Sequence, residues 1–402
     1  MAAERSLINT DVVIVGAGLV GLTAAIGLSR LGKKVVLTDA NPAQSLPADW
    51  ISDVAHWDAR IYALTNQTVN WLRALGVWSR LPPSRMNPIA AMHLWSPTHQ
   101  HATPSLRLTA DEAHLPEMGY IVESQALMHA CWQVLADTEV TVITDAPAQS
   151  LQHGGHVARL SLPQHEIEAC LLLGADGARS WVRAQCGVGV QQVDFAQTAL
   201  VANFKAERPH GNIARQWFSE HETLALLPMP QQQVSLVWAL PHAFAAQKQA
   251  LSAQDLALEV AERSGQLLGQ LTPSGPVLAF QLMQNTADTM ALPQVMLLGD
   301  AAHQVHPMAG QGVNLGFQDV HALCAQIAQL PAMKPLGDAG FLRHVMRTRQ
   351  PDIVKMHALT RGLDALFARP QAIWTHAALL GLRGVENSAM LKRFLIRAAT
   401  QS

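Results

Sequence analysis

The stretch that decides the fold of this chain is Val12-Val13-Ile14-Val15-Gly16-Ala17-Gly18-Leu19-Val20-Gly21. Its first four residues are apolar and β-branched without alternation, which is typical of a parallel strand covered on both faces. Three glycines then interrupt the apolar pattern where a tight turn belongs, and a helix is expected over 22–31. The stretch predicts a strand, a turn and a buried helix. A membrane span is excluded because the apolar run is too short and is broken by glycines.

A second strand and an acidic residue complete a nucleotide-binding pattern. The apolar run 35–38 predicts the next strand, and it ends at Asp39. In this pattern Gly16 allows the tight turn, Gly18 lets a pyrophosphate approach the backbone, and Gly21 lets helix and strand pack closely. The helix N-terminus attracts the phosphates, and Asp39 accepts hydrogen bonds from ribose hydroxyls. The pattern predicts a Rossmann-like site without distinguishing NAD from FAD.

Composition excludes several classes of protein. The 402 residues are 49% hydrophobic and only 14% charged, whereas about 25% charged is ordinary, so the chain must bury a core and is not intrinsically disordered. With 28 Lys+Arg against 30 Asp+Glu and a net charge of −2, nucleic acid is not an expected partner. The four cysteines lie far apart without a C-x-x-C pair, which excludes a disulfide framework and a redox pair and suits a reducing cytosol.

A second motif lies far downstream. The apolar run 295–298 predicts a strand that leads into Gly299 and Asp300, and a glycine-rich run over 310–316 precedes another helix. A second acidic residue at a strand end would be redundant for NAD, but it suits a longer ligand that is held at two places. We therefore favour FAD, whose ribityl chain Asp300 would hold by charge-assisted hydrogen bonds. Backbone N–H groups around Gly312 to Asn314 would stabilise negative charge on its ring.

Four segments in order carry a resemblance to a known family. They are 16–21, Asp58-Ala59-Arg60, Gly174-Ala175-Asp176-Gly177-Ala178-Arg179-Ser180 and Gly299-Asp300. In these segments the chain resembles the group A FAD-dependent aromatic hydroxylases. The resemblance implies that Arg60 reaches the flavin pyrophosphate and the reduced nicotinamide cofactor. It also implies that the motif of Asp176 serves both FAD and NAD(P)H, with Arg179 as a candidate contact for the NAD(P)H phosphate.

A narrower resemblance covers essentially the whole chain. The segments 58–64, 306–316 and 360–367 look like those of the ubiquinone-biosynthesis hydroxylases. The chain departs from that family at Asp39, where Glu is common, at Ser124, where Asn is frequent, and in the ending 398–400. The resemblance implies an FAD-dependent monooxygenase that uses NAD(P)H and O₂ to hydroxylate the aromatic ring of a polyprenylated ubiquinone precursor.

The same resemblance implies positions around the flavin. Pro307 would lie near its reacting edge, and Gln125 would contact it from the helix after Glu123. The residues near its pyrimidine side would be Gly312, Val313 and Asn314, and Gly310 is a further candidate for cofactor binding. The flavin carries the chemistry, so no catalytic triad is expected, and water must be kept out of the site. Tyr62 and Tyr120, the two tyrosines, fall in cofactor segments, which leaves activation of a phenol by tyrosine unsupported.

The expected fold class is α/β. A Rossmann-like FAD-binding domain with a parallel sheet would be interleaved with a smaller antiparallel-sheet substrate domain and followed by C-terminal helices. The FAD-binding domain is assigned to 1–75, 118–183 and 290–345, the substrate domain to 76–117 and 184–289, and the terminal helices to 346–402.

Other interpretations stay open. The chain could be a related flavoprotein of different chemistry, such as a prenyl reductase or a hydroxylase of a small aromatic, or a non-catalytic flavin-binding subunit of a quinone-biosynthesis complex. A halogenase is disfavoured because its W-x-W-x-I-P segment is absent. His303 and His306 have a spacing that suits a metal, but no carboxylate and histidine constellation accompanies them, so no metal is expected.

The basic C-terminal tail raises the question of a membrane. Between 383 and 402 four basic residues stand against Glu386, a local charge of +4 − 1 = +3, and Leu391, Phe394 and Leu395 share one helical face. Such a helix can lie on an anionic membrane or dock on a partner protein. A packed terminal helix with solvated charges is the favoured alternative. We expect a cytoplasmic protein with peripheral access to a membrane.

Overall fold

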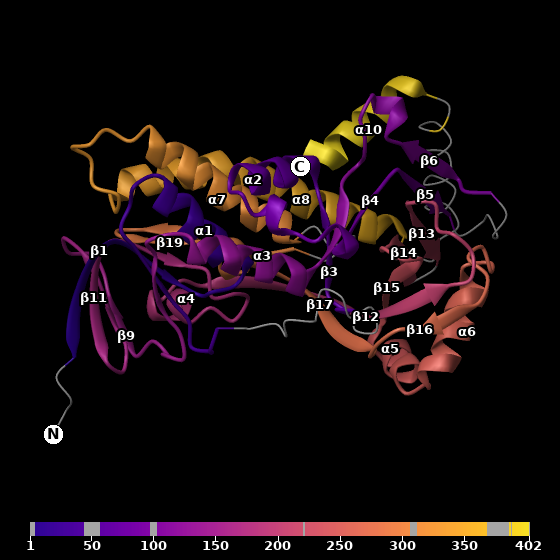
Figure 1. Ribbon diagram of the computed structural model, residues 1–402, viewed down its shortest axis with the longest axis horizontal. Coiled ribbons are helices and arrows are strands. Elements are labelled where there is room, and N and C mark those ends of the chain that lie inside the picture. Colours follow the sequence, from indigo (N-terminus) through magenta and orange to yellow (C-terminus); the bar gives the residue numbers. More distant parts are fainter. Residues whose placement is uncertain are drawn as a thin grey trace.

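The computed structural model describes residues 5–43, 57–96, 103–219, 222–305, 312–367, 386 and 388–401. These residues form an eight-stranded sheet, a nine-stranded sheet and a three-stranded sheet. Figure 1 shows the eight-stranded sheet at one end of the molecule and the nine-stranded sheet at the other, with long helices lying across the top. The fold is therefore α/β, as the sequence predicts.

The eight-stranded sheet is built on β1 (Ser6–Val15), which lies between β11 (His165–Gly174) and β2 (Val35–Thr38) and pairs with both in parallel. The strands β19 (Val295–Leu297) and β8 (Thr141–Ile143) extend the parallel part on either side. The strands β9 (Ser150–Gln152), β10 (Ala158–Ser161) and β18 (Ala291–Leu292) are antiparallel additions. Val12, Val13 and Ile14 are fully buried, as expected for a strand covered on both faces.

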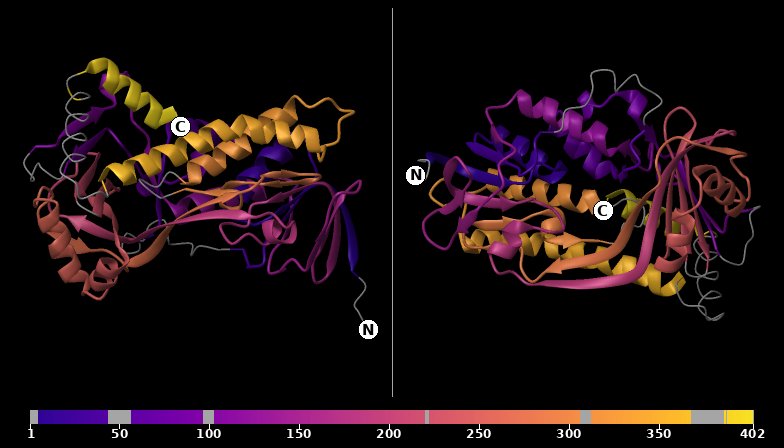
Figure 2. Two further views of the ribbon diagram at one scale, coloured as in Figure 1. Left: turned by 180° about the vertical axis from the view of Figure 1, so that it is seen from behind. Right: turned by 90° about the horizontal axis from the view of Figure 1, so that it is seen from below.

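Helices cover this sheet. They are α1 (Leu19–Arg30), α2 (Asn66–Ala74), α3 (Ser124–Ala136), α4 (Trp181–Gln185), α7 (Gly312–Ala328) and α8 (Ala339–Phe367). A Cβ on Gly316 of α7 would lie 2.6 Å from the Val20 Cγ2 atom of α1, so glycine allows these two helices to approach closely. Figure 2 shows α7 and α8 side by side, and residues of the two helices are in contact.

The nine-stranded sheet is antiparallel except where β13 (Ile213–Ser219) pairs with β5 (Ala91–Trp95). Its other strands are β6 (Leu106–Thr109), β12 (Val190–Ala206), β14 (Glu222–Pro228), β15 (Gln233–Pro241), β16 (Leu271–Pro273), β17 (Leu278–Ala287) and β20 (His303–Gln304). Helices α5 (His242–Gln249) and α6 (Ala253–Arg263) close one face over a core that includes Phe204 and Trp238. The long strands β12 and β17 run from this sheet toward the eight-stranded one (Figure 2).

Three short strands form the third, small sheet. It consists of β3 (Ile61–Leu64), β7 (Tyr120–Glu123) and β4 (Met86–Pro88). The remaining elements are four single turns and one helix, namely η1 (Trp78–Arg80), η2 (Pro83–Arg85), η3 (Asp111–Ala113), η4 (Gly299–Ala301) and α10 (Ala389–Gln401). In the described part of the chain, every helix is too short or too polar to cross a membrane.

Candidate functional site

A pocket of about 470 Å³ opens at the carboxyl ends of β1, β2 and β11. This is the edge of a parallel sheet at which ligands bind in open α/β folds, and the volume suits a small-molecule site. The pocket brings together five of the residues that the sequence singles out, which are Gly16, Gly18, Asp39, Asp176 and Arg179.

The three glycines of the turn have different surroundings. Gly16 has a φ of +110°, and a Cβ there would lie 2.4 Å from the Ala175 carbonyl oxygen. A Cβ on Gly21 would lie only 1.8 Å from the carbonyl oxygen of Gly16. A Cβ on Gly18 would meet nothing within 4 Å. The first and third glycines are therefore required by packing, whereas the second leaves open space beside the backbone.

Asp39 braces the glycine turn. Its Oδ2 atom accepts a hydrogen bond from the Ala17 N–H at 2.7 Å, and its Oδ1 atom accepts from the Asn41 backbone N–H at 2.8 Å. The Asn41 side chain also donates to Oδ1, at 3.1 Å. A carboxylate has about four acceptor positions, so Asp39 retains capacity for a ligand hydroxyl while it fixes the turn.

Asp176 has a comparable bracing role. Its carboxylate accepts from the Ser180 hydroxyl at 2.6 Å and from the Val182 N–H at 3.0 Å. Ser180 caps α4 by accepting from the Arg183 N–H at 2.9 Å. Arg179, between these residues, is exposed at the pocket.

Arg183 connects the two glycine-rich motifs, and sequence reasoning missed it. Its buried guanidinium donates to the carbonyl oxygen of Ala178 at 2.8 Å and to that of Ala301 at 2.9 Å. The first carbonyl belongs to the middle motif and the second to η4, beside Asp300. The capping pattern of α4 could have identified the helix, but nothing local in sequence indicates a carbonyl partner that lies 118 residues away.

A second group of predicted residues gathers around Asp58. One carboxylate oxygen accepts from the Arg60 N–H and the other from the Gln125 N–H, each at 2.9 Å. The Arg60 guanidinium lies 5.4 Å from the ring centroid of Phe280, which is a cation–π distance. The side chains of Arg60 and Gln125 are exposed. Asp58 therefore ties the early arginine motif to the start of α3 and leaves both side chains free to meet a ligand.

Asp300 joins this second group. Its side chain is accessible, yet the surrounding protein raises the pKa of its carboxyl by desolvation, against the lowering effect of the charges of His303 and Arg60. A side chain that solvent reaches from one side, and that protein surrounds on the others, is both accessible and partly desolvated. The Tyr62 hydroxyl bonds to Ser124, and burial raises its pKa, with a further contribution from the charge of Asp300.

A buried ion pair between Glu123 and Arg85 holds Asp58, the centre of the second group. Glu123 accepts from the Asp58 N–H at 2.7 Å and pairs with the Arg85 guanidinium at 3.2 Å, and both side chains of the pair are 1% exposed. Arg85 also lies over the ring of Trp57, 4.8 Å from its centroid. Burial raises the pKa of Glu123 to about 7, although the Asp58 N–H and Arg85 lower it. Sequence reasoning missed Arg85, because the residues around it show no periodicity.

The start of α7 is used differently from what the sequence suggests. Gly312 and Val313 open the helix, where backbone N–H groups lack intrahelical partners. The buried Asn314 side chain is held at both of its polar atoms, since its Oδ1 accepts at 3.1 Å from the N–H of Thr65, the N-cap of α2, and its Nδ2 donates at 2.8 Å to the Ala63 carbonyl oxygen of β3. Only the backbone of Asn314 is left for a ligand.

Two predicted flavin contacts before α7 and the two histidines of the candidate metal spacing remain to be located. Pro307 and Gly310 lie outside the described residues, as does His306. His303 is described, and its Nε2 atom lies 2.6 Å from an Asp319 carboxylate oxygen. Across the described ranges no group of three or more His, Cys, Asp or Glu side chains could hold a metal ion.

Comparisons with known proteins agree with this geometry. The model of the FAD binding domain family matches residues 9–333. The chain is 33% identical to 3-demethoxyubiquinol 3-hydroxylase of Escherichia coli (strain K12) over 97% of this chain and 98% of the relative. It is 34% identical to ubiquinone hydroxylase UbiL of Rhodospirillum rubrum, over 97% of this chain and 89% of the relative.

Solved structures share the fold. The crystal structure of p-nitrophenol 4-monooxygenase PnpA from Pseudomonas putida DLL-E4 matches with a TM-score of 0.77 and 15% identity, over 98% of each chain. A variant of HpxO from Klebsiella pneumoniae, complexed with FAD, also has a TM-score of 0.77, with 16% identity over 98% of each chain. The chain therefore belongs to the FAD binding domain family and, within it, to the ubiquinone-biosynthesis hydroxylases, which makes it an FAD-dependent aromatic monooxygenase.

Proposed function

We propose that this enzyme hydroxylates the aromatic ring of a polyprenylated ubiquinone precursor, with NAD(P)H as reductant and O₂ as the source of oxygen. The observation that carries the proposal is the 33% identity to a 3-demethoxyubiquinol 3-hydroxylase over nearly the full length of both chains. It is supported by ligand-facing motifs that meet at the carboxyl edge of one parallel sheet, as an extended dinucleotide requires.

The residues of the site fit FAD. Open space at Gly18 and the positive φ of Gly16 leave the backbone accessible to a pyrophosphate. Asp39 has spare acceptor positions for the ribose, and Asp300 offers an accessible carboxylate to the ribityl chain. Bound FAD supplies the chemistry, by passing electrons from NAD(P)H to O₂ for insertion of one oxygen atom into the ring.

The other assignments are proposals of the same kind. Arg60 and Arg179 present exposed guanidinium groups for the flavin pyrophosphate and for NAD(P)H phosphate. The exposed Gln125 lies beside Arg60 at the start of α3. Asp176 acts by bracing the loop of Arg179, and Gly21 acts by packing against Gly16. Gly312, Val313 and Asn314 contribute backbone N–H groups, and Pro307 and Gly310 complete the set in the undescribed segment before α7.

The chain's own residues must keep water away from the reacting atoms. An apolar cluster that includes Ile61, Ala214, Leu227 and Met229 connects the small sheet with the nine-stranded sheet. Packed apolar side chains of this kind exclude water from the region between the two sheets. Burial raises the pKa of Tyr62, so its phenol stays protonated at neutral pH and cannot serve as a base.

The proposal is tested by product analysis under isotopically heavy O₂. The purified enzyme is given NAD(P)H and a short-chain prenylated demethoxyquinol, and the product is examined by mass spectrometry. We expect heavy oxygen in the ring and little turnover of the same quinol without a prenyl chain. Prenyl-chain reduction without oxygen incorporation would indicate a reductase. FAD binding without substrate-stimulated NAD(P)H oxidation would indicate a non-catalytic subunit.

A single substitution tests the role of Asp300. Asp300→Ala removes charge-assisted hydrogen bonds, which are each worth roughly 1.5–3 kcal/mol, so FAD should bind about 10- to 100-fold more weakly. Flavin retained after gel filtration and the Kd for FAD give the result. Asp137→Ala changes an exposed acid of a surface ion pair and serves as the control. An Asp300→Ala variant with full flavin content would contradict the assignment.

We also propose peripheral contact with an anionic membrane through α10. The helix is anchored by Ile396, which is fully buried, and by Lys392, whose Nζ lies 3.1 Å from Glu112 and 3.0 Å from Glu386. Its opposite face exposes Met390 by 81% and Phe394 by 68%. The exposed Arg393 and Arg397 flank that face. An apolar strip beside basic residues suits an anionic lipid surface.

Vesicle flotation tests this contact. The enzyme should float with vesicles that contain phosphatidylglycerol and much less with pure phosphatidylcholine. Phe394→Ser should weaken the binding, whereas Leu258→Ser should not, because Leu258 is 60% exposed but lies on α6. Equal binding of the two variants would exclude α10 as the contact, and capture of a partner protein in place of vesicles would assign the face to a quinone-biosynthesis complex.

A further inference from the structure

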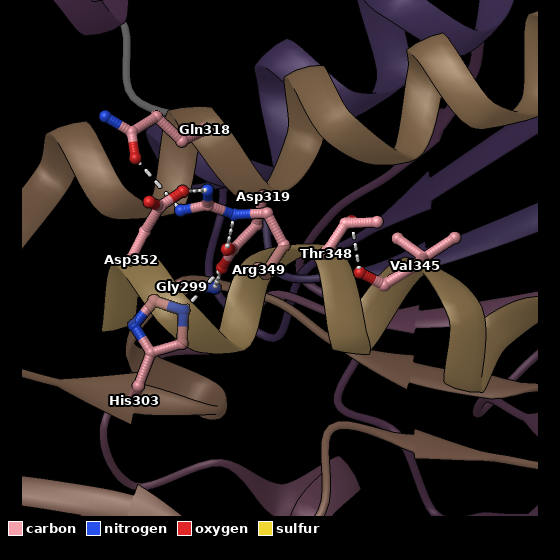
Figure 3. Close-up of polar contacts among 8 residues, drawn as sticks. All are labelled: Gly299, His303, Gln318, Asp319, Val345, Thr348, Arg349 and Asp352. Carbon is pink, nitrogen blue, oxygen red and sulfur yellow. Dashed lines mark hydrogen bonds and ion pairs between the residues drawn. The ribbon is translucent and has the colours of Figure 1, made fainter. Parts of the chain in front are cut away.

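The turn that presents Asp300 is held by a carboxylate on another element. Asp319 of α7 is fully buried, and one of its oxygens, Oδ2, accepts from the Gly299 N–H at 3.0 Å and bonds to His303 Nε2 at 2.6 Å. Figure 3 shows these two contacts converging on the same group. Because Gly299 and His303 flank Asp300 in the chain, both ends of its turn are attached to one oxygen atom.

A third contact attaches Asp319 to helix α8. Arg349 donates from Nε to the Asp319 Oδ1 atom at 3.0 Å and from Nη2 to Gln318 at 2.9 Å, and it also pairs with Asp352 (Figure 3). Burial alone would raise the pKa of Asp319, but His303, Arg349 and the Gly299 N–H together lower it. The carboxylate is therefore ionised, and three protein donors hold it.

The turn itself needs such a restraint. Gly299 has a φ of +56°, and a Cβ there would lie 3.0 Å from Val20 Cγ2 of α1 and 3.6 Å from the Cα of Gly316 of α7. The turn therefore contacts α1 and α7 through Gly299, where these two helices pack together. Glycine has no side chain that could fix the orientation of the turn. The hydrogen bonds of Gly299 and His303 to Asp319 restrain its orientation, together with the hydrogen bond from Arg183 to Ala301.

We propose that Asp319 is a positioning residue for FAD, and that Arg349 makes this positioning depend on α8. Asp319 touches no ligand. It acts by directing Asp300 toward the ribityl chain, so the inference rests on the proposed role of Asp300. Arg349, itself held by Gln318 and Asp352, donates to the second oxygen of Asp319, Oδ1.

A double-mutant cycle on FAD affinity tests the inference. The apo forms of the native enzyme, Asp319→Asn, Asp300→Ala and the double variant are titrated with FAD, and flavin fluorescence gives each Kd. Asn has a single acceptor oxygen, so Asp319→Asn should weaken FAD binding about 10-fold, a loss typical of one hydrogen bond to a charged group. In the Asp300→Ala background the same substitution should have little further effect, because coupled residues are not additive.

A second variant and a matched control keep the test decisive if Asp319→Asn does not fold. Arg349→Lys retains the positive charge but loses the planar donor fork, and it should show a smaller loss of affinity that also disappears in the Asp300→Ala background. Thr348→Ala is the control, because the Thr348 hydroxyl donates only to Val345 of its own helix, at 2.7 Å. Its FAD affinity should be unchanged.

The outcomes separate the two proposals. Equal losses from Asp319→Asn, or from Arg349→Lys, in both backgrounds would mean that Asp319 acts only by packing α7 against α8, which overturns the inference and leaves the role of Asp300 intact. Unchanged FAD affinity in these variants would have the same meaning. Full flavin binding by Asp300→Ala would overturn the role of Asp300 and the inference together.

Discussion

The two ends of the nucleotide site are stabilised by different kinds of interaction. At the β1–β2 end, backbone atoms lie against backbone atoms, with Gly21 and Gly16 in contact and Gly16 against Ala175. At the β19 end, the turn of Asp300 is held by buried charges from α7 and α8. The glycine turn of the first end is local in sequence, although it packs against the distant residue Ala175, and the second end is held by side chains from two further helices.

The difference has an energetic consequence. A Cβ placed 1.8 Å from a carbonyl oxygen meets a steric repulsion that only a backbone shift can relieve. A lost hydrogen bond in a network leaves a graded penalty that other donors share in part. We therefore expect substitutions at the β1–β2 end to abolish FAD binding, and substitutions at the β19 end to weaken FAD binding by a limited factor.

The largest effect is expected at the third glycine. Gly21→Ala should abolish FAD binding and destabilise the apo protein by several kcal/mol, since overpacking typically costs about 1–3 kcal/mol and this contact is severe. Gly18→Ala is the matched control, because its Cβ would meet no atom of the protein within 4 Å. Thermal unfolding of the two apo variants measures the contrast, and equal melting temperatures would refute the packing argument.

An intermediate effect is expected where the two ends are joined. Arg183→Met removes hydrogen bonds to Ala178 and Ala301, and we expect a loss of about 3 kcal/mol of unfolding free energy, since hydrogen bonds to charged groups contribute roughly 1.5–3 kcal/mol each. The nearby Arg179→Met should change stability by less than about 0.5 kcal/mol, as exposed positions usually do. Urea unfolding distinguishes them. If both variants are equally stable, Arg183 does not join the two motifs energetically.

The smallest effect is a pH dependence that arises at Glu123, the buried acid that holds Asp58. The pKa of Glu123 is raised from 4.5 to about 7, so this group contributes stability that is present below pH 4.5 and is lost as the pH rises through 7. Relative to Glu123→Gln, the native enzyme should lose roughly 2.5 kcal/mol of unfolding free energy between pH 4.5 and pH 7, given about 1.4 kcal/mol per pKa unit less the part lost to half-titration at either end. Denaturant unfolding at a series of pH values measures this, and parallel curves for the two proteins would contradict it.

The same contrast explains which parts of the site could be predicted from the sequence. The strand, turn, helix and acid over 12–39 are local, so their order in the chain predicts their order in space, and the observed β1, α1 and β2 agree. Asp319 and Arg349 were not predicted, because nothing in a linear pattern shows which buried acid meets which arginine across 30 residues.

Some residues were predicted at the correct place but with an incomplete role. Asn314 was chosen as part of a helix start that faces a ligand, and its side chain instead bonds to Ala63 of the distant strand β3 and to Thr65, the N-cap of α2. Asp39 was chosen for the ribose, and it also braces Ala17. In both cases the additional partners lie outside the motif or become neighbours only when the turn forms.

The central claim is that the two ends of the FAD site are held by separate structural devices. Calorimetric titration of apo Asp319→Asn and native apo protein with FAD and with ADP, which contains only the adenosine end of the ligand, tests it most directly. We expect Asp319→Asn to bind FAD about 10-fold more weakly and to bind ADP as the native protein does. A loss of ADP affinity equal to the loss of FAD affinity would contradict the claim.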